Sequence, residues 1–134
     1  MRLQRVWARA LGLGRDAVVE SVRVEDGGGG EVIVVSCRLR RRAVRHCGRC
    51  QKRSPGYDQG EGRRRWRALD AGTTRVYVQA WAARVTCVDH GVVVAAVPWA
   101  RHGAGHTRAF DDQVAWLVTH TSKTAVTALM RVAW

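Results

Sequence analysis

Two short hooks of metal-binding residues constrain the fold of this chain more than any other sequence feature. Cys47 and Cys50 are separated by two residues, and after 36 further residues Cys87 and His90 repeat that spacing. Each hook places two soft ligand atoms on one tight turn, and the two hooks together supply the four ligands of a tetrahedral zinc site. Because four protein ligands leave no open coordination position, the sequence predicts one structural Zn²⁺ and no catalytic metal.

Other cysteine and histidine side chains compete for the same role. Cys37 belongs to an alternating apolar run from Ile33 to Leu39, so we expect it to point into the core. His46 adjoins Cys47 and stays open as a replacement ligand. The remaining histidines lie in loop or helix contexts, where we expect them in solvent or facing phosphate: His102, His106 and His120.

The positive charge of the chain is concentrated in one segment. The sequence has 23 Lys and Arg against 11 Asp and Glu, a net charge of +12, and ten of these excess charges fall within residues 38–67. A plain alternative is a solvated surface in a protein that favours arginine. The clustering of the charge favours a phosphate-facing surface. Arginine suits this role, because its planar guanidinium binds phosphate through two hydrogen bonds. The predicted contacts are Arg38, Arg40, Arg41, Arg42, Arg45, Arg49, Lys52, Arg53, Arg63, Arg64, Arg65 and Arg67.

Local patterns predict an α+β fold: a small β-rich zinc-ribbon domain followed by two helices. Expected strands cover 17–25, 31–39, 64–70, 74–87 and 92–94, after an amphipathic helix near residues 3–11. Segment 40–62 is expected to be a loop around the first hook. Two helices begin at Asp111 and after Ser122, which is a suitable N-cap. The predicted domains are therefore 1–98, a linker over 99–110, and 111–134.

The composition also limits the compartment and the chemistry. No stretch approaches 18 consecutive apolar residues, and charges interrupt the first nine residues too often for a secretory signal. We therefore expect a cytoplasmic protein with no membrane partner. A chain of 134 residues leaves little scaffold for a large catalytic cleft, so we expect no small-molecule substrate.

The order of these motifs resembles the N-terminal region of ISL-type insertion-sequence transposases. The resemblance runs from about residue 17 to the end of the chain. The residues that carry it are Cys47-Gly48-Arg49-Cys50, Trp66 to Gly72, Arg84 to Gly91, Val97 to Arg101, Phe110 to Leu117 and Ser122 to Val126.

In that family a zinc-finger domain comes first, a helix-turn-helix follows, and an RNase-H-like catalytic domain comes last. The resemblance implies that Cys47, Cys50, Cys87 and His90 are the zinc ligands. It also implies that residues 111–134 form the first two helices of an incomplete helix-turn-helix. Because the sequence stops at Trp134, we expect a truncated transposase that is not an enzyme on its own.

The expected function is DNA binding at the terminal inverted repeats of a mobile element. One alternative is a nucleic-acid-binding module without sequence preference, in which exposed tryptophans stack on bases. Trp66, flanked by arginines, is the first tryptophan to test in that role. Another alternative is an inactive remnant that interferes with full-length transposase at its sites. The tryptophans are Trp7, Trp66, Trp81, Trp99, Trp116 and Trp134.

Overall fold

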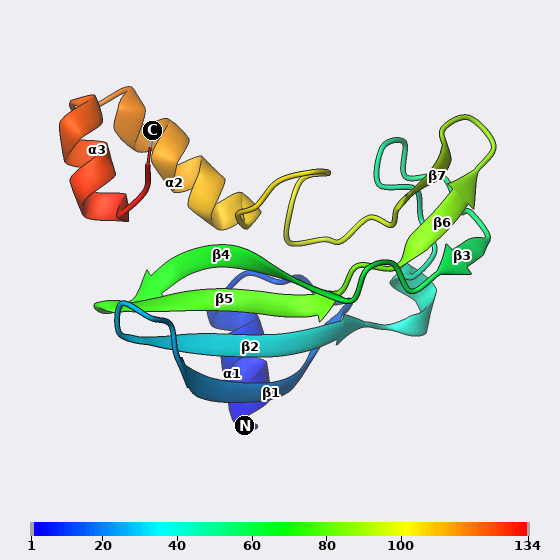
Figure 1. The fold of residues 1–134 in the computed structure, drawn as a ribbon, viewed down its shortest axis with the longest axis horizontal. Helices are drawn as coiled ribbons and strands as arrows, with labels where there is room; N and C mark the ends of the chain where they lie inside the picture. Colours follow the sequence, from blue (N-terminus) through cyan, green and yellow to red (C-terminus); the bar gives the residue numbers. More distant parts are fainter. Residues whose placement is uncertain (1, 134) are drawn as a thin grey trace.

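Two antiparallel-rich sheets and three α-helices make up the molecule, which confirms the α+β prediction (Figure 1). The computed structural model describes residues 2–133, so Trp134 lies outside the described part of the chain. The larger sheet has the order β1-β2-β5-β4, and the smaller one has the order β3-β6-β7. The strands are β1 (Ala17–Asp26), β2 (Glu31–Leu39), β3 (Gly56–Asp58), β4 (Arg63–Ala71), β5 (Thr74–Trp81), β6 (Arg84–Cys87) and β7 (Gly91–Val94). The helices are α1 (Leu3–Ala10), the 3₁₀ turn η1 (Arg41–Ala43), α2 (Arg108–Val118) and α3 (Lys123–Met130).

The four-stranded sheet is built from two hairpins, whose strands lie in the segments expected at 17–25, 31–39, 64–70 and 74–87. In the first, β1 and β2 pair from Ala17 with Leu39 to Asp26 with Glu31, around the glycine-rich turn. In the second, β4 and β5 are antiparallel. The two hairpins join through β2 and β5, which run parallel. Parallel neighbours need a long crossover connection, and here residues 40–73 supply it, including the first metal hook.

One face of this sheet carries the main apolar core. Val35, Val76 and Val78 lie in it and are each fully buried, and α1 packs on this core through Trp7 and Ala8, followed by Leu11 and Leu13 just after its C-terminal end. Figure 1 shows α1 lying behind the strands.

Trp66 belongs to the same core. Its ring meets that of Trp99 edge to face at a centroid distance of 5.5 Å, and only 2% of its surface is exposed. Trp66 therefore cannot stack on bases in this fold, so that hypothesis is wrong for this residue.

The single strand predicted over 74–87 is two strands in two different sheets. β5 ends at Trp81, the chain crosses at Ala82 and Ala83, and β6 begins at Arg84 in the smaller sheet. Main-chain hydrogen bonds hold the crossing, from Ala82 N–H to Gly62 and from Ala95 N–H to Ala83. Apolar and polar residues alternate only loosely over 74–87. The reason is that the segment changes sheet, so each half has its own buried face.

The two C-terminal helices form a second, smaller core beside β4. Phe110, Val126 and Met130 are buried together there. α2 begins at Arg108, earlier than expected, because the Thr107 hydroxyl accepts from the Phe110 amide and caps the helix. Ser122 caps α3 in the same way, as predicted.

The segment predicted as a linker, 99–110, is packed rather than extended. Trp99 and Ala100 lie in the core of the larger sheet, and Thr107 is 1% exposed. The division of the chain into domains stays a prediction. Within residues 2–133, none of the helices has the length and apolar character needed to cross a membrane.

Candidate metal centre and nucleic-acid interface

The first hook is a tight turn closed by main-chain hydrogen bonds. The amide of Cys47 donates to Lys52, and the amide of Gln51 donates back to Cys47. A further amide, that of Arg49, donates to the sulfur of Cys47 at 3.4 Å. Such N–H···S contacts stabilise a thiolate, which is the form of cysteine that binds metal.

Gly48 is required in this turn by close packing. A side chain at this position would collide with the main-chain oxygen of Val94 and with the ring of His102. The first hook is also tied to the end of the β7 segment, because Cys47 pairs with Ala95 and the Ala96 amide donates to His46. The smaller sheet and the first hook therefore form one unit.

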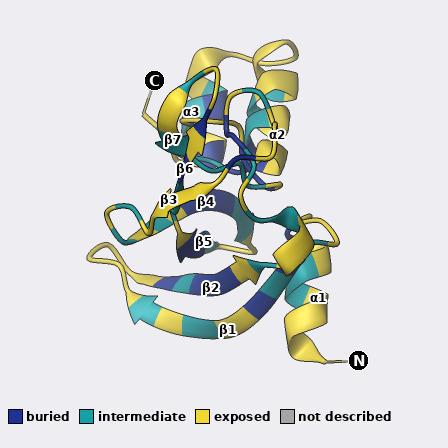
Figure 2. Ribbon diagram, turned by 90° about the vertical axis from the view of Figure 1, so that its right-hand side faces the viewer, coloured by how far each residue is buried: buried dark blue, intermediate teal, exposed yellow. Residues whose placement is uncertain are grey.

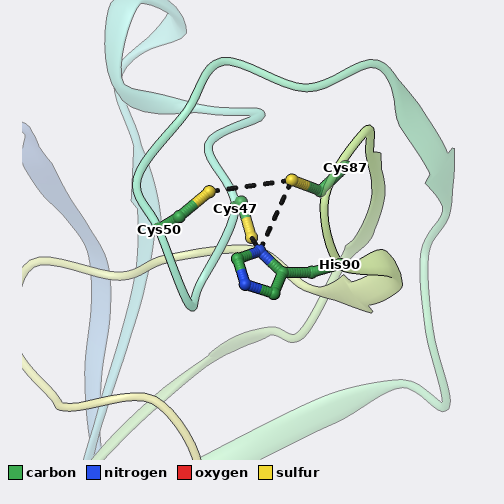
Figure 3. A group of neighbouring side chains, drawn as sticks. All are labelled: Cys47, Cys50, Cys87 and His90. Carbon is green, nitrogen blue, oxygen red and sulfur yellow. Dashed lines mark hydrogen bonds between the residues drawn. The ribbon is translucent and has the colours of Figure 1, made fainter.

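The second hook is the turn between β6 and β7. Cys87 is the last residue of β6 and pairs with Gly91, the first residue of β7. Gly91 has a φ of +69°, a left-handed conformation that favours glycine. The hairpin thus presents Cys87 and His90 on the same side, toward the first hook (Figure 3).

The four predicted ligands converge, with all ligand atoms within 4.8 Å of one another. The sulfurs of Cys50 and Cys87 are 3.6 Å apart, and Nδ1 of His90 is 3.7 Å from the sulfurs of both Cys47 and Cys87 (Figure 3). Tetrahedral zinc with ordinary bond lengths separates two sulfurs by about 3.8 Å and a sulfur from a nitrogen by about 3.6 Å. The residues present therefore fit a zinc ion, with Nδ1 as the histidine donor.

The electrostatics of the hooks also favour a metal. The pKa of Cys87 is lowered to about 6, first by the main-chain N–H of Asp89 and then by the ring and amide of His90. Burial raises the pKa of Cys37 to about 12, so this thiol stays neutral in the core, as predicted. Cys87 is thus prepared to ionise near neutral pH, whereas burial and the neighbouring thiols of Cys87 and Cys47 raise the pKa of Cys50.

Lys52 links the two hooks. Its ammonium lies 2.5 Å from the carboxylate of Asp89, and this contact raises the pKa of Lys52 and lowers that of Asp89. The pair is exposed, so its contribution to stability is small. The predicted phosphate contact at Lys52 has a protein partner in this structure.

Several other predicted phosphate contacts also have protein partners. Arg42 pairs with Asp16 at 2.6 Å, Arg65 pairs with Glu25 at 2.6 Å, and Arg38 lies 3.9 Å from Glu20. The guanidinium of Arg40 donates to the main chain of Arg15, and that of Arg64 donates to Ala104 while lying over the ring of Trp66.

Arg67 is removed from the surface altogether. It is 9% exposed, lies over the Phe110 ring, and donates to the carbonyl oxygens of Met130 and Arg131 at the end of α3. This guanidinium caps the helix and fixes it to β4. Its burial excludes it from the surface available to phosphate in this structure.

Five of the predicted basic residues have guanidinium groups without an acidic partner in the described part of the chain. Within residues 2–133, no acidic side chain lies within ion-pair distance of any of them, and all five are exposed. Four come from the segment that surrounds the first hook, and the fifth begins β4. We call them the open arginines: Arg41, Arg45, Arg49, Arg53 and Arg63.

Sequence reasoning named Trp81 only as one of six tryptophans that could stack on bases, and it did not name Tyr57. Trp81 is 53% exposed at the end of β5, and Tyr57 is 57% exposed in β3. The expected single strand over 74–87 places Trp81 within the strand and therefore gave no reason to expect it at a strand end. The Ala82-Ala83 dipeptide after it was the available signal of the crossing between sheets.

Comparisons with known proteins agree with the site. Residues 43–90 match the zinc finger of transposase IS204/IS1001/IS1096/IS1165, and residues 95–134 match the helix-turn-helix domain of transposase family ISL3. The first match includes both hooks, and the second includes α2 and α3. No solved structure matches the chain.

Two curated proteins are similar over the whole chain. Each is a transposase for insertion sequence element IS1557 from Mycobacterium tuberculosis, one from strain CDC 1551 / Oshkosh and one from strain ATCC 25618 / H37Rv. The identity is 49% in both cases, and the chain spans 31% of the length of these relatives. The chain therefore carries the zinc-ribbon and helix-turn-helix domains of ISL3-family transposases over the residues that these two models match.

Proposed function

We propose that this chain binds duplex DNA at the terminal inverted repeats of an insertion sequence, in the bacterial cytoplasm. Zinc held by Cys47, Cys50, Cys87 and His90 would fix the ribbon, and the open arginines would contact phosphates. The observation that carries the proposal is the position of Arg45, Arg49 and Arg53 on or beside the first metal hook, without acidic partners. Phosphate contacts of this kind supply most of the affinity for DNA.

The role of the metal is to cross-link two turns that are far apart in sequence. When bound, zinc joins the first hook to the β6–β7 hairpin and thereby fixes the spacing of the arginines between residues 41 and 53. The chain's own residues also support the two hooks. The amide of Arg49 supports the sulfur of Cys47, and Lys52 and Asp89 join the hooks at the surface.

The helix pair would supply sequence readout beside the ribbon. α2 and α3 are fixed on β4 by Arg67 and by the apolar cluster around Phe110. Side chains on these helices are therefore held at a constant distance from the open arginines. Phosphate contacts would set the position on the duplex, and base contacts from the helix pair would select the sequence.

The carboxylates of the chain support binding rather than strand transfer. Asp70 pairs with Arg131, and Asp89 pairs with Lys52. Asp111 and Asp112 both face Arg101 at the start of α2. Because these acids are committed to ion pairs, we propose that the described residues bind DNA and leave strand transfer to other parts of the transposase.

A salt-titrated binding assay tests the proposal. Fluorescence anisotropy would compare a labelled duplex that carries the element's end with a shuffled duplex of equal composition. We expect tighter binding to the element's end and an affinity that falls steeply with salt. Arg49→Ala should lower the slope of log K against log salt by about one. Arg42→Ala is the matched control, since Arg42 is paired with Asp16.

Each other outcome of the assay has a clear meaning. Equal affinity for both duplexes would favour a module without sequence preference. No binding at low salt would overturn the proposal. Displacement of full-length transposase from the element's end would show that the chain occupies the same sites, as an interfering fragment would.

A further inference from the structure

A groove separates the two sheets, and one of the open arginines, Arg45, lines it. Its volume is about 480 Å³, and its walls come from the ends of β2 and β5 on one side and from β3 and β6 on the other. Leu39, Ala80, Val85 and Val97 make its lining apolar. A groove of this size exceeds what a few water molecules need and is comparable to sites that hold an aromatic ligand.

Two exposed aromatic rings form the edges of this groove. Trp81 stands at the end of β5 and Tyr57 stands in β3, and both line the groove. Each ring has an arginine over it, with the Arg63 guanidinium 5.7 Å from the centre of Trp81 and that of Arg84 5.2 Å from the centre of Tyr57. More than half of each aromatic side chain stays exposed, so a further flat group has access to it.

The charges at the groove match a nucleic-acid strand. Arg38, Arg45 and Arg84 line it, and Arg63 lies over its aromatic edge. One acid, Asp58, also lines the groove and is paired with Arg84. An apolar slot with aromatic edges and cationic borders is the combination that single-stranded DNA uses, because bases stack on the rings while phosphates meet the arginines.

We propose that this groove binds unpaired bases of a DNA strand, stacked on Trp81 and Tyr57. The inference rests on the proposed DNA-binding function and adds a ligand class, an unpaired or unstacked strand next to the duplex. Trp81 and Tyr57 would be the stacking residues, and the open arginines Arg45 and Arg63 would hold the adjoining phosphates. A duplex with a single-stranded tail should therefore bind more tightly than a blunt duplex.

The test compares three DNA ligands of the same duplex sequence in the same buffer. One is blunt, one has a single-stranded tail with bases, and one has an equally long abasic tail with the same phosphates. We expect the base-containing tail to bind about ten- to a hundredfold more tightly than the abasic one, which is the effect of stacking one or two bases. Equal affinity of the two tails would overturn the inference, while blunt-duplex binding would still stand.

Variants of the zinc-loaded chain locate the effect. Trp81→Ala should remove most of the gain from the base-containing tail and leave blunt-duplex affinity unchanged, and Trp81→Phe should keep part of the gain. Trp116→Ala is the matched control, because Trp116 is 60% exposed on α2 and stacked on His120, away from the groove. A loss of tail preference in Trp116→Ala as large as in Trp81→Ala would overturn the assignment.

A different occupant would give a different pattern. If a later segment of a longer transposase fills the groove, the isolated chain should show no preference for base-containing tails, and Trp81→Ala should leave all three DNA affinities unchanged. That pattern overturns the inference. Zinc content and the thermal midpoint of each variant, measured alongside, show that the altered affinities come from folded protein.

Discussion

The two sheets of this protein are stabilised by different means. The four-stranded sheet buries a continuous set of valines, alanines and tryptophans under α1. In the three-stranded sheet β3 is exposed along its whole length, and of the residues in its strands only Val85 and Cys87 are buried (Figure 2). The larger sheet therefore has enough apolar contact to fold by the hydrophobic effect, whereas the smaller sheet depends on its metal ligands.

This difference explains where the open arginines lie. The open arginines repel one another, which opposes folding of any segment that groups them. In the ribbon the metal supplies a local, strong constraint that offsets this repulsion without a large core. The larger sheet can meanwhile anchor the helix pair through Arg67.

Metal removal should produce the largest effect and separate the two sheets. Structural zinc contributes roughly 10–16 kcal/mol of apparent binding free energy in small domains. We expect strong chelation, or Cys50→Ser, to collapse the amide NMR dispersion of residues 43–58 and 84–97 while signals of β1, β2, β4 and β5 persist. Cys37→Ser is the control and should keep its metal. Simultaneous loss of both sheets would contradict the comparison.

Truncation of a core aromatic side chain should destabilise the larger sheet and leave the metal site intact. Trp66→Ala removes a buried ring that packs on Trp99, and such changes cost about 3–5 kcal/mol. We expect urea unfolding followed by circular dichroism to show that loss, with zinc content unchanged by metal analysis. A loss of bound zinc equal to the loss of stability would mean that the sheets are one cooperative unit.

Removal of the buried guanidinium should release the helix pair. In Arg67→Met the carbonyl oxygens of Met130 and Arg131 lose their donors, a cost of about 2–3 kcal/mol. Hydrogen exchange of α2 and α3 amides should accelerate, with the ribbon unaffected. Arg65→Met, which loses an exposed pair with Glu25, should change stability by less than about 1 kcal/mol. Equal effects of the two variants would rule out this role for Arg67.

The smallest effect is expected at a helix cap. Ser122→Ala removes the acceptor for the Ala125 amide and should cost about 1 kcal/mol. The change should be local to α3 and visible as faster exchange of its first amides. Thr121→Ala, one residue earlier, is the control, and faster exchange in that variant would place the cap elsewhere.

The sequence predicted the parts of this fold that local spacing determines. The two hooks, the strands at 17–25 and 31–39 and the Ser122 cap each depend on residues close together in the chain. The crossing from β5 to β6 was missed, because the alternation of residues 74–87 continues through it while the buried face changes partner.

The prediction of charge roles was also incomplete for a physical reason. Residues 38–67 identified a basic segment but gave no information on which guanidinium groups meet distant acids. Arg42, Arg65 and Arg67 find partners in Asp16, Glu25 and the end of α3. Those contacts span more than twenty residues in each case.

X-ray absorption at the zinc edge of the purified chain measures the coordination at the centre of this account. Three sulfurs at about 2.3 Å and one nitrogen at about 2.0 Å, with one zinc per chain, are the expected result. A shell of only nitrogen and oxygen, or a folded ribbon in a chain that holds no zinc, would contradict the assignment of Cys47, Cys50, Cys87 and His90.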